Sequence, residues 1–253
     1  MDGDKNRELA EPGGIARLFV DAPLGEGARI APSPQQAHYL LRVMRARAGD
    51  RVLLFNGRDG EWAAHVADVS RRGCTLVCEV RRAPQAATPD LWLCFAPIKK
   101  TPADYVAQKA TELGVRVLQP VLTRRTIVHR VNCERIRANA IEAAEQSGRT
   151  DVPDIREPAP LETLLATWPN DRRILFCDEA GDAPPIARAL SDAESGPWAV
   201  LTGPEGGFEA REREAIRSLG CVTAVSLGPR IMRADTAALA ALAVWQAIRG
   251  DWR

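Results

Sequence analysis

The sequence of 253 residues lacks the features that mark membrane-spanning, secreted or metal-binding proteins. No apolar run is long enough to cross a bilayer, and the polar, acid-bearing start over residues 1–14 fits neither a signal peptide nor an arginine-rich transit peptide. The six cysteines form no C-x-x-C pair, and the three histidines do not cluster with them. We therefore expect a disordered lead-in, buried reduced thiols, no metal, no membrane contact and a cytoplasmic location.

Two common nucleotide-binding signatures are also missing, although glycine-bearing loops are present. Residues 201–208 read L-T-G-P-E-G-G-F and residues 227–237 read L-G-P-R-I-M-R-A-D-T-A. Neither a P-loop nor a G-x-G-x-x-G fingerprint fits these segments. Each segment runs from an apolar stretch through a glycine loop into a helical pattern. Alone each could be an ordinary strand-to-helix turn, but the pair predicts a pocket built from backbone groups and helix N-termini.

The chain divides into two parts with different periodicities. Residues 16–83 contain short Val-, Leu- and Phe-rich runs, with one helical spacing over 35–47, which predicts a small β-barrel with one helix. The prolines and small residues of 81–89 predict a linker. From residue 90 onward strands and helices alternate, which predicts a mostly parallel sheet covered on both faces, with ligands at the carboxyl ends of its strands. Strands are expected at 91–98, 117–122, 174–177, 199–201 and 224–227, and helices at 102–113, 133–147, 185–190, 210–219 and 236–248.

Positive charge gathers in the first part, although the net charge of the chain is only +1. Between Arg29 and Ala83 there are ten arginines against five acidic residues. Arginine suits phosphate recognition because its planar guanidinium offers several donors. This excess is consistent with an RNA-binding face, and equally with a solvated surface in an arginine-rich protein.

Two further segments make a family resemblance specific. Residues 108–115 read Q-K-A-T-E-L-G-V and residues 142–149 read E-A-A-E-Q-S-G-R. Together with the two glycine loops, in this order, they resemble the RsmE family of SPOUT methyltransferases, the 16S rRNA (uracil-N3)-methyltransferases. The resemblance runs from Arg17 to the C-terminus and is strongest from Lys99 onward. In the last loop the family reads R-I-L-R-x-E-T-A, whereas Met232 and Asp235 stand here, which makes a role for that carboxylate less secure.

The resemblance implies a fold, a cofactor and a substrate. It implies a SPOUT-type trefoil-knotted parallel sheet over 84–253, preceded by a PUA-like β-barrel over 16–83 and a disordered stretch over 1–15. It implies S-adenosylmethionine as cofactor, N3-methylation of a uridine in the decoding region of 16S rRNA, an assembled or nearly assembled small ribosomal subunit as substrate, and a homodimer through the second domain. The alternatives are a ribose 2′-O-methyltransferase of the same superfamily and a non-catalytic RNA-binding assembly factor.

The site residues follow from these segments. Glu205 is a candidate base, or a solvated turn residue, and Arg233 is a candidate catalytic donor, or an ion-pair partner of Asp235. Gly206 and Gly207 are expected to hold backbone conformations that a Cβ would strain. The expected cofactor contacts are Leu201, Thr202, Gly203, Pro204, Glu205, Gly206, Gly207, Leu227, Gly228, Ile231, Met232, Arg233, Thr236 and Ala237. The expected RNA contacts are Arg42, Arg45, Arg47, Lys109, Arg125, Arg149 and Arg230.

Overall fold

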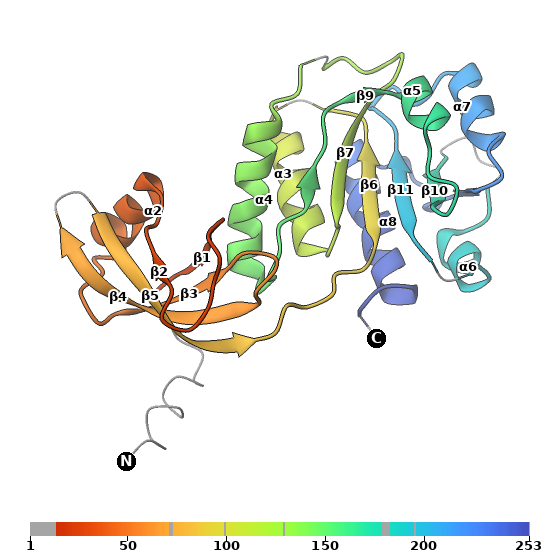
Figure 1. Cartoon of the computed structure of the whole chain (residues 1–253). Helices are drawn as coiled ribbons and strands as arrows, with labels where there is room; N and C mark the ends of the chain where they lie inside the picture. The colour runs from red at the N-terminus through yellow and green to blue at the C-terminus, as the bar shows by residue number, and fades with distance from the viewer. Residues whose placement is uncertain are drawn as a thin grey trace. The chain divides into compact units, whose positions relative to one another are not determined.

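A computed structural model describes residues 14–70, 73–98, 100–128, 130–178, 183–194 and 196–252. The expected disorder over 1–15 lies almost entirely outside the described residues. The described chain forms two compact units, one within residues 1–87 together with 144–152, and one within residues 88–143 together with 153–253. Figure 1 shows their strands and helices.

The first unit is built on a five-stranded sheet in the order β1-β3-β4-β5-β2. Among the strands that the structure describes in this sheet, only β1 and β3 run parallel, and bulges interrupt the long pairing of β4 with β5. The side chains of Leu54, Val66 and Leu76 are fully buried in its core. The expected small β-rich unit is confirmed. Its sheet is open, because no pairing joins the two edge strands, β1 and β2, among the described residues. The strands are β1 (Arg17–Phe19), β2 (Arg29–Ile30), β3 (Arg51–Phe55), β4 (Glu61–Ser70) and β5 (Gly73–Ala83).

One interrupted helix accompanies this sheet. Helix α2 (Pro34–His38) starts with a capping box, in which the side chains of Ser33 and Gln36 each accept a hydrogen bond from the other residue's backbone N–H. The helix continues as the π-helix η1 (Tyr39–Val43). It ends earlier than the expected residue 47 because Arg45 takes a left-handed conformation with φ of 57°. This turn leaves the arginines of the segment on the surface.

Residues 144–152 group with the first compact unit, an addition that the sequence analysis did not predict. The Arg17 guanidinium donates to the carbonyl oxygens of Ala144 and Arg149 at 2.6 and 2.5 Å. The backbone N–H of Gly57 donates to the Thr150 carbonyl at 2.9 Å. These bonds join segments that are far apart in sequence, so chain order alone could not indicate them.

The second unit is a seven-stranded sheet in the order β12-β10-β11-β6-β7-β8, with β9 also paired to β7, and every pairing is parallel. The expected α/β architecture is confirmed; the trefoil knot stays a prediction. Its strands are β6 (Leu91–Phe95), β7 (Val117–Leu122), β8 (Asp154–Ile155), β9 (Ala159–Pro160), β10 (Arg173–Cys177), β11 (Trp198–Thr202) and β12 (Val222–Val225).

Helices cover both faces of this sheet, and alternate strand residues point to the two faces (Figure 1). Leu93 faces a core with α3 and α8, whereas Cys94 faces a core with α5 and α7. Among the described residues no helix is long and apolar enough to cross a membrane. The helices are α3 (Lys100–Glu112), α4 (Cys133–Ser147), α5 (Leu161–Ala166), α6 (Ile186–Ser191), α7 (Ala210–Arg217) and α8 (Ala234–Ile248).

Candidate functional site

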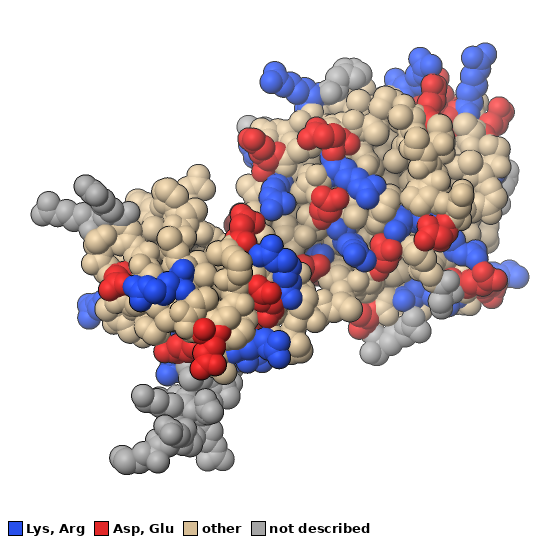
Figure 2. All heavy atoms as spheres, in the orientation of Figure 1, with Lys and Arg blue, Asp and Glu red and all other residues tan. Residues whose placement is uncertain are grey.

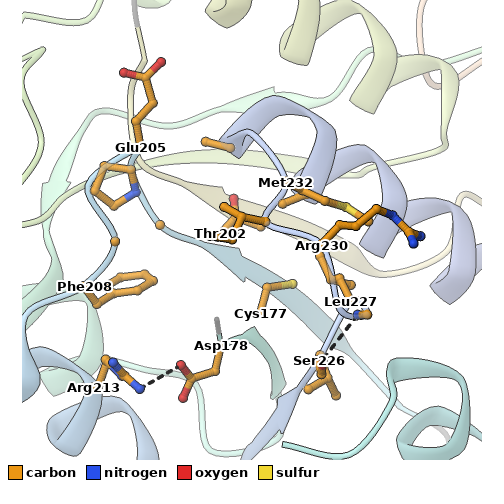
Figure 3. A pocket seen from close by; sticks show the side chains of 18 of the residues that line it. Cys177, Asp178, Thr202, Glu205, Phe208, Arg213, Ser226, Leu227, Arg230 and Met232 are labelled. Carbon is orange, nitrogen blue, oxygen red and sulfur yellow. Dashed lines mark hydrogen bonds and ion pairs between the residues drawn. The ribbon is translucent and has the colours of Figure 1, made fainter. Parts of the chain in front are cut away.

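A cavity of about 520 Å³ lies at the carboxyl ends of β10, β11 and β12 (Figure 3). This volume is within the range of sites for small ligands, and the position is where a parallel sheet places them. The lining residues are Cys177, Asp178, Thr202, Gly203, Pro204, Glu205, Gly207, Phe208, Arg213, Val225, Ser226, Leu227, Gly228, Pro229, Arg230, Ile231, Met232, Ala234 and Ala237.

The loop between β11 and α7 forms one wall of the cavity. The Gly207 N–H donates to the Pro204 carbonyl at 2.9 Å, and Gly207 has φ of 68°, which a side chain would strain. A Cβ on Gly203 would come within 2.6 Å of the Phe208 ring. Gly206 has no such constraint, because a Cβ there would make ordinary contact with Arg125 at 3.5 Å. The expectation of strain is therefore confirmed at Gly207 and wrong at Gly206.

The loop between β12 and α8 forms the opposite wall. Gly228 has φ of 109°, and its N–H donates to the Ser226 hydroxyl oxygen at 3.2 Å. Ile231 lines the cavity although the residue is 94% exposed. Arg233 is exposed and forms the N-cap residue of α8, outside the lining residues. No ion pair joins Arg233 to Asp235, both of which the structure describes.

The end of β10 contributes two lining residues that the sequence analysis missed. The Asp178 carboxylate is 1% exposed and forms ion pairs with Arg213 at 3.3 Å and Arg217 at 2.6 Å (Figure 3 shows the first). These pairs hold α7, and hence the glycine loop before it, against β10. Burial raises the pKa of the Cys177 thiol to about 12, which favours the protonated thiol at neutral pH.

The loop after β7 braces the glycine loop from outside the cavity. The Arg125 guanidinium donates through Nη1 to the Gly206 carbonyl at 2.8 Å. The buried Glu212 carboxylate accepts the backbone N–H of Arg124 at 2.8 Å and that of Glu209 at 2.9 Å. Glu212 therefore caps α7 and fastens two loops together, which is a role that its position in a charged helix does not reveal.

The structure brings most of the expected cofactor contacts together. Four of the expected residues do not line the cavity. Leu201 is buried within β11, and the other three are Gly206, Arg233 and Thr236. All contacts to a cofactor stay predictions. The expected contacts that line the cavity are Thr202, Gly203, Pro204, Glu205, Gly207, Leu227, Gly228, Ile231, Met232 and Ala237.

The expected RNA contacts lie in four different environments. Arg230 lines the cavity, and Arg125 binds the glycine loop. Lys109 forms an ion pair with Glu112 at 2.7 Å. Arg149 differs most from its expected role, because its side chain is only 8% exposed and pairs with Asp151 at 2.7 Å. Arg42, Arg45 and Arg47 are exposed on the first unit and form no ion pair with any described residue.

Surface charge does not by itself mark a binding face. In Figure 2 acidic and basic side chains are interspersed over the visible side of the molecule. Within the described residues, no group of three or more His, Cys, Asp or Glu side chains could hold a metal ion. All six cysteines are free, but only Cys78 and Cys94 are fully buried, which is fewer than expected.

Comparison with known proteins gives matches over both units. A model of an RNA methyltransferase domain matches residues 85–246, and a model of an RNA methyltransferase PUA domain matches residues 33–78. The ribosomal RNA small subunit methyltransferase E of Rickettsia conorii is 31% identical over 229 residues, covering 90% of this chain and 93% of the relative.

Solved structures agree with these matches. The ribosomal RNA small subunit methyltransferase E of Neisseria gonorrhoeae, bound to S-adenosyl methionine, superimposes with a TM-score of 0.85 at 27% identity, covering 94% of this chain and 99% of that one. A methyltransferase of Legionella pneumophila, in complex with the same cofactor, has a TM-score of 0.83 at 26% identity, covering 95% and 100%.

Proposed function

Because this chain belongs to the RNA methyltransferase family that includes ribosomal RNA small subunit methyltransferase E, we propose that it methylates N3 of a uridine in 16S rRNA, with S-adenosylmethionine as methyl donor. The observation that carries this proposal is the cavity between the two glycine loops at the carboxyl ends of β10, β11 and β12. An intact pocket of this kind is not needed by a non-catalytic RNA-binding factor.

The cavity fits such a donor in size and chemistry. Phe208, Leu227 and Met232 supply apolar walls for an adenine ring and a thioether chain. Thr202 and Ser226 offer hydroxyl groups for the polar parts of the ligand. The left-handed backbone at Gly207 lets the main chain turn close against a bound molecule.

The protein must then position the base and remove one proton. S-adenosylmethionine supplies a methyl group already activated by its sulfonium. Uracil N3 carries a hydrogen and attacks well only after losing it. Glu205 lines the cavity, is exposed, and makes no ion pair among the described residues, so its carboxylate is free to accept that proton.

Arg233 is proposed as a donor to negative charge that develops on a uracil oxygen. Removing one such donor typically costs about 3–4 kcal/mol, so we expect Arg233→Ala to lower kcat on the order of a hundred- to a thousandfold. Binding of S-adenosylmethionine, measured by calorimetry, should stay near normal. Arg233→Lys should recover only part of the rate because the bidentate fork is lost. A turnover near that of the wild type would remove Arg233 from the catalytic site.

Arg42, Arg45 and Arg47 are proposed to contact RNA phosphates. Each lost contact should reduce the slope of log affinity against log salt by about 0.7 to 0.9. The triple alanine variant should therefore bind 16S rRNA more weakly and with a flatter salt dependence, while its affinity for S-adenosylmethionine is unchanged. Arg29→Ala is the matched control, because that guanidinium already pairs with Asp68 at 2.6 Å. If the triple variant behaves like Arg29→Ala in filter-binding titrations, these arginines are only a solvated surface.

The setting of the reaction is also a proposal. The resemblance noted in the sequence supports an assembled or nearly assembled small subunit as substrate, methylation in the decoding region, a homodimer through residues 84–253 and action in the cytoplasm. The helix α8 adds some support for the dimer, since Leu239 and Ala243 remain partly exposed beside its buried face.

The proposed function is tested by mapping rRNA methylation in cells with and without the gene. Mass analysis of 16S rRNA fragments should show one methylated uridine that disappears with the gene and returns with it. Loss of a ribose-methylated nucleoside instead would indicate the 2′-O-methyltransferase alternative. Unchanged methylation, together with no cofactor binding by calorimetry, would indicate a non-catalytic assembly factor.

A further inference from the structure

A second, smaller hollow adjoins the cofactor cavity. It is lined by Pro97, Ile98, Arg125, Ile127, Val128, Pro204, Glu205 and Gly206. Pro204 and Glu205 line both spaces, so a group held in the hollow lies against the same loop as a ligand in the cavity. Methyl transfer needs the donor and the acceptor in direct contact. The hollow is therefore in the right place for the acceptor.

The walls of the hollow suit the edge of a flat ring. Its enclosed volume is about 20 Å³, so only one edge of a nucleobase enters, and the rest lies over the rim. Pro97 and Ile98, which follow β6, are buried apolar residues that line the hollow. Ile127 on the rim is 73% exposed, and a large apolar side chain exposed beside a pocket is typical of a binding surface.

The polar groups of the hollow match the edge of uracil that carries N3. This edge presents an oxygen acceptor, the N3–H donor and a second oxygen acceptor. The bond from Nη1 to the Gly206 carbonyl fixes the Arg125 guanidinium, whose other N–H groups form no bond with the described residues. The Glu205 carboxylate offers an acceptor for N3–H. Cytosine has no hydrogen on N3, so it would leave Glu205 without a donor.

We propose that this hollow binds the target uracil, with Arg125 donating to a carbonyl oxygen and Glu205 accepting the N3 proton. This assignment rests on the proposed function. As the N3–H bond breaks, the proton passes to the Glu205 carboxylate, and N3 forms a bond to the methyl carbon. The electron pair of the broken carbon–sulfur bond stays on sulfur. The Arg125 guanidinium stabilises the negative charge that develops, as the proton leaves, on the uracil oxygen to which it donates.

The test compares Arg125→Ala with Arg124→Ala in the full chain. Arg124 is the matched control because its exposed guanidinium lies 3.5 Å from Glu162, outside the hollow. We expect Arg125→Ala to lower kcat/KM for 16S rRNA on the order of a hundredfold with unchanged affinity for S-adenosylmethionine. Its pH profile should shift toward higher pH, because the deprotonated uracil has lost a donor. Arg125→Lys should restore part of the rate, and Ile127→Ala should raise KM for the RNA.

Two other results for Arg125→Ala would overturn the assignment of the hollow. If Arg125→Ala matches Arg124→Ala in rate and pH profile, the hollow is not the uracil site. If Arg125→Ala instead loses cofactor affinity and keeps the pH profile, Arg125 only braces the glycine loop, and the assignment is again overturned. Failure of the proposed function is seen separately, in the wild-type protein, as a methylated nucleoside other than 3-methyluridine.

Discussion

Gly207→Val is expected to weaken binding of S-adenosylmethionine by roughly a hundredfold or more. A β-branched residue at φ of 68° is strained by about 1–3 kcal/mol, and the loop relieves that strain only by moving its backbone away from the cavity. The N-terminal unit has no part in this loop and should stay folded. Calorimetric titration with the cofactor, alongside circular dichroism, measures both effects.

Gly206→Ala is the matched control for that variant. Its Cβ would make only ordinary contact with Arg125, so cofactor affinity should stay close to that of the wild type. Gly207→Ala should give an intermediate loss, which separates strain in the loop from global unfolding. Unchanged affinity in Gly207→Val would remove this loop from the cofactor site.

Glu205→Gln is expected to lower kcat by about two to four orders of magnitude, the usual contribution of a positioned general base. The amide has nearly the same shape as the carboxylate but accepts no proton, so cofactor affinity and KM for RNA should change little. Single-turnover methylation of 16S rRNA with saturating cofactor measures the chemical step directly.

Glu214→Gln provides the comparison, because Glu214 is an exposed carboxylate on α7 that does not line the cavity. It should methylate at the wild-type rate. A Glu205→Gln protein as fast as Glu214→Gln would show that another group, or water, takes the N3 proton.

Regular, strongly patterned segments of this fold were predictable from the sequence. The strand Val117–Leu122 and the helix Cys133–Ser147 have the predicted bounds. Helix α5 (Leu161–Ala166) and the two-residue strands β2, β8 and β9 were missed. These segments are too short to show a hydrophobic period, and their place depends on neighbours in the folded chain.

The parts of the candidate site formed by glycine loops were predictable from the sequence. The parts that depend on the order of strands in the sheet were not. The two glycine loops stand out in the sequence and line the cavity. Asp178 follows β10, which lies between β11 and β12 although it precedes both in the chain. Only that crossover brings its carboxylate to α7 and the cavity. The burial of Arg149 likewise depends on the fold, although its partner Asp151 is only two residues away.

The central claim is methylation at uracil N3, and one measurement tests it most directly. Purified protein is incubated with isotopically labelled S-adenosylmethionine and small ribosomal subunits from cells that lack the gene, and the 16S rRNA is then digested to nucleosides for mass analysis. We predict that the label appears in 3-methyluridine at a single position. Label in a ribose-methylated nucleoside, or in no nucleoside while the protein binds the cofactor, would contradict it.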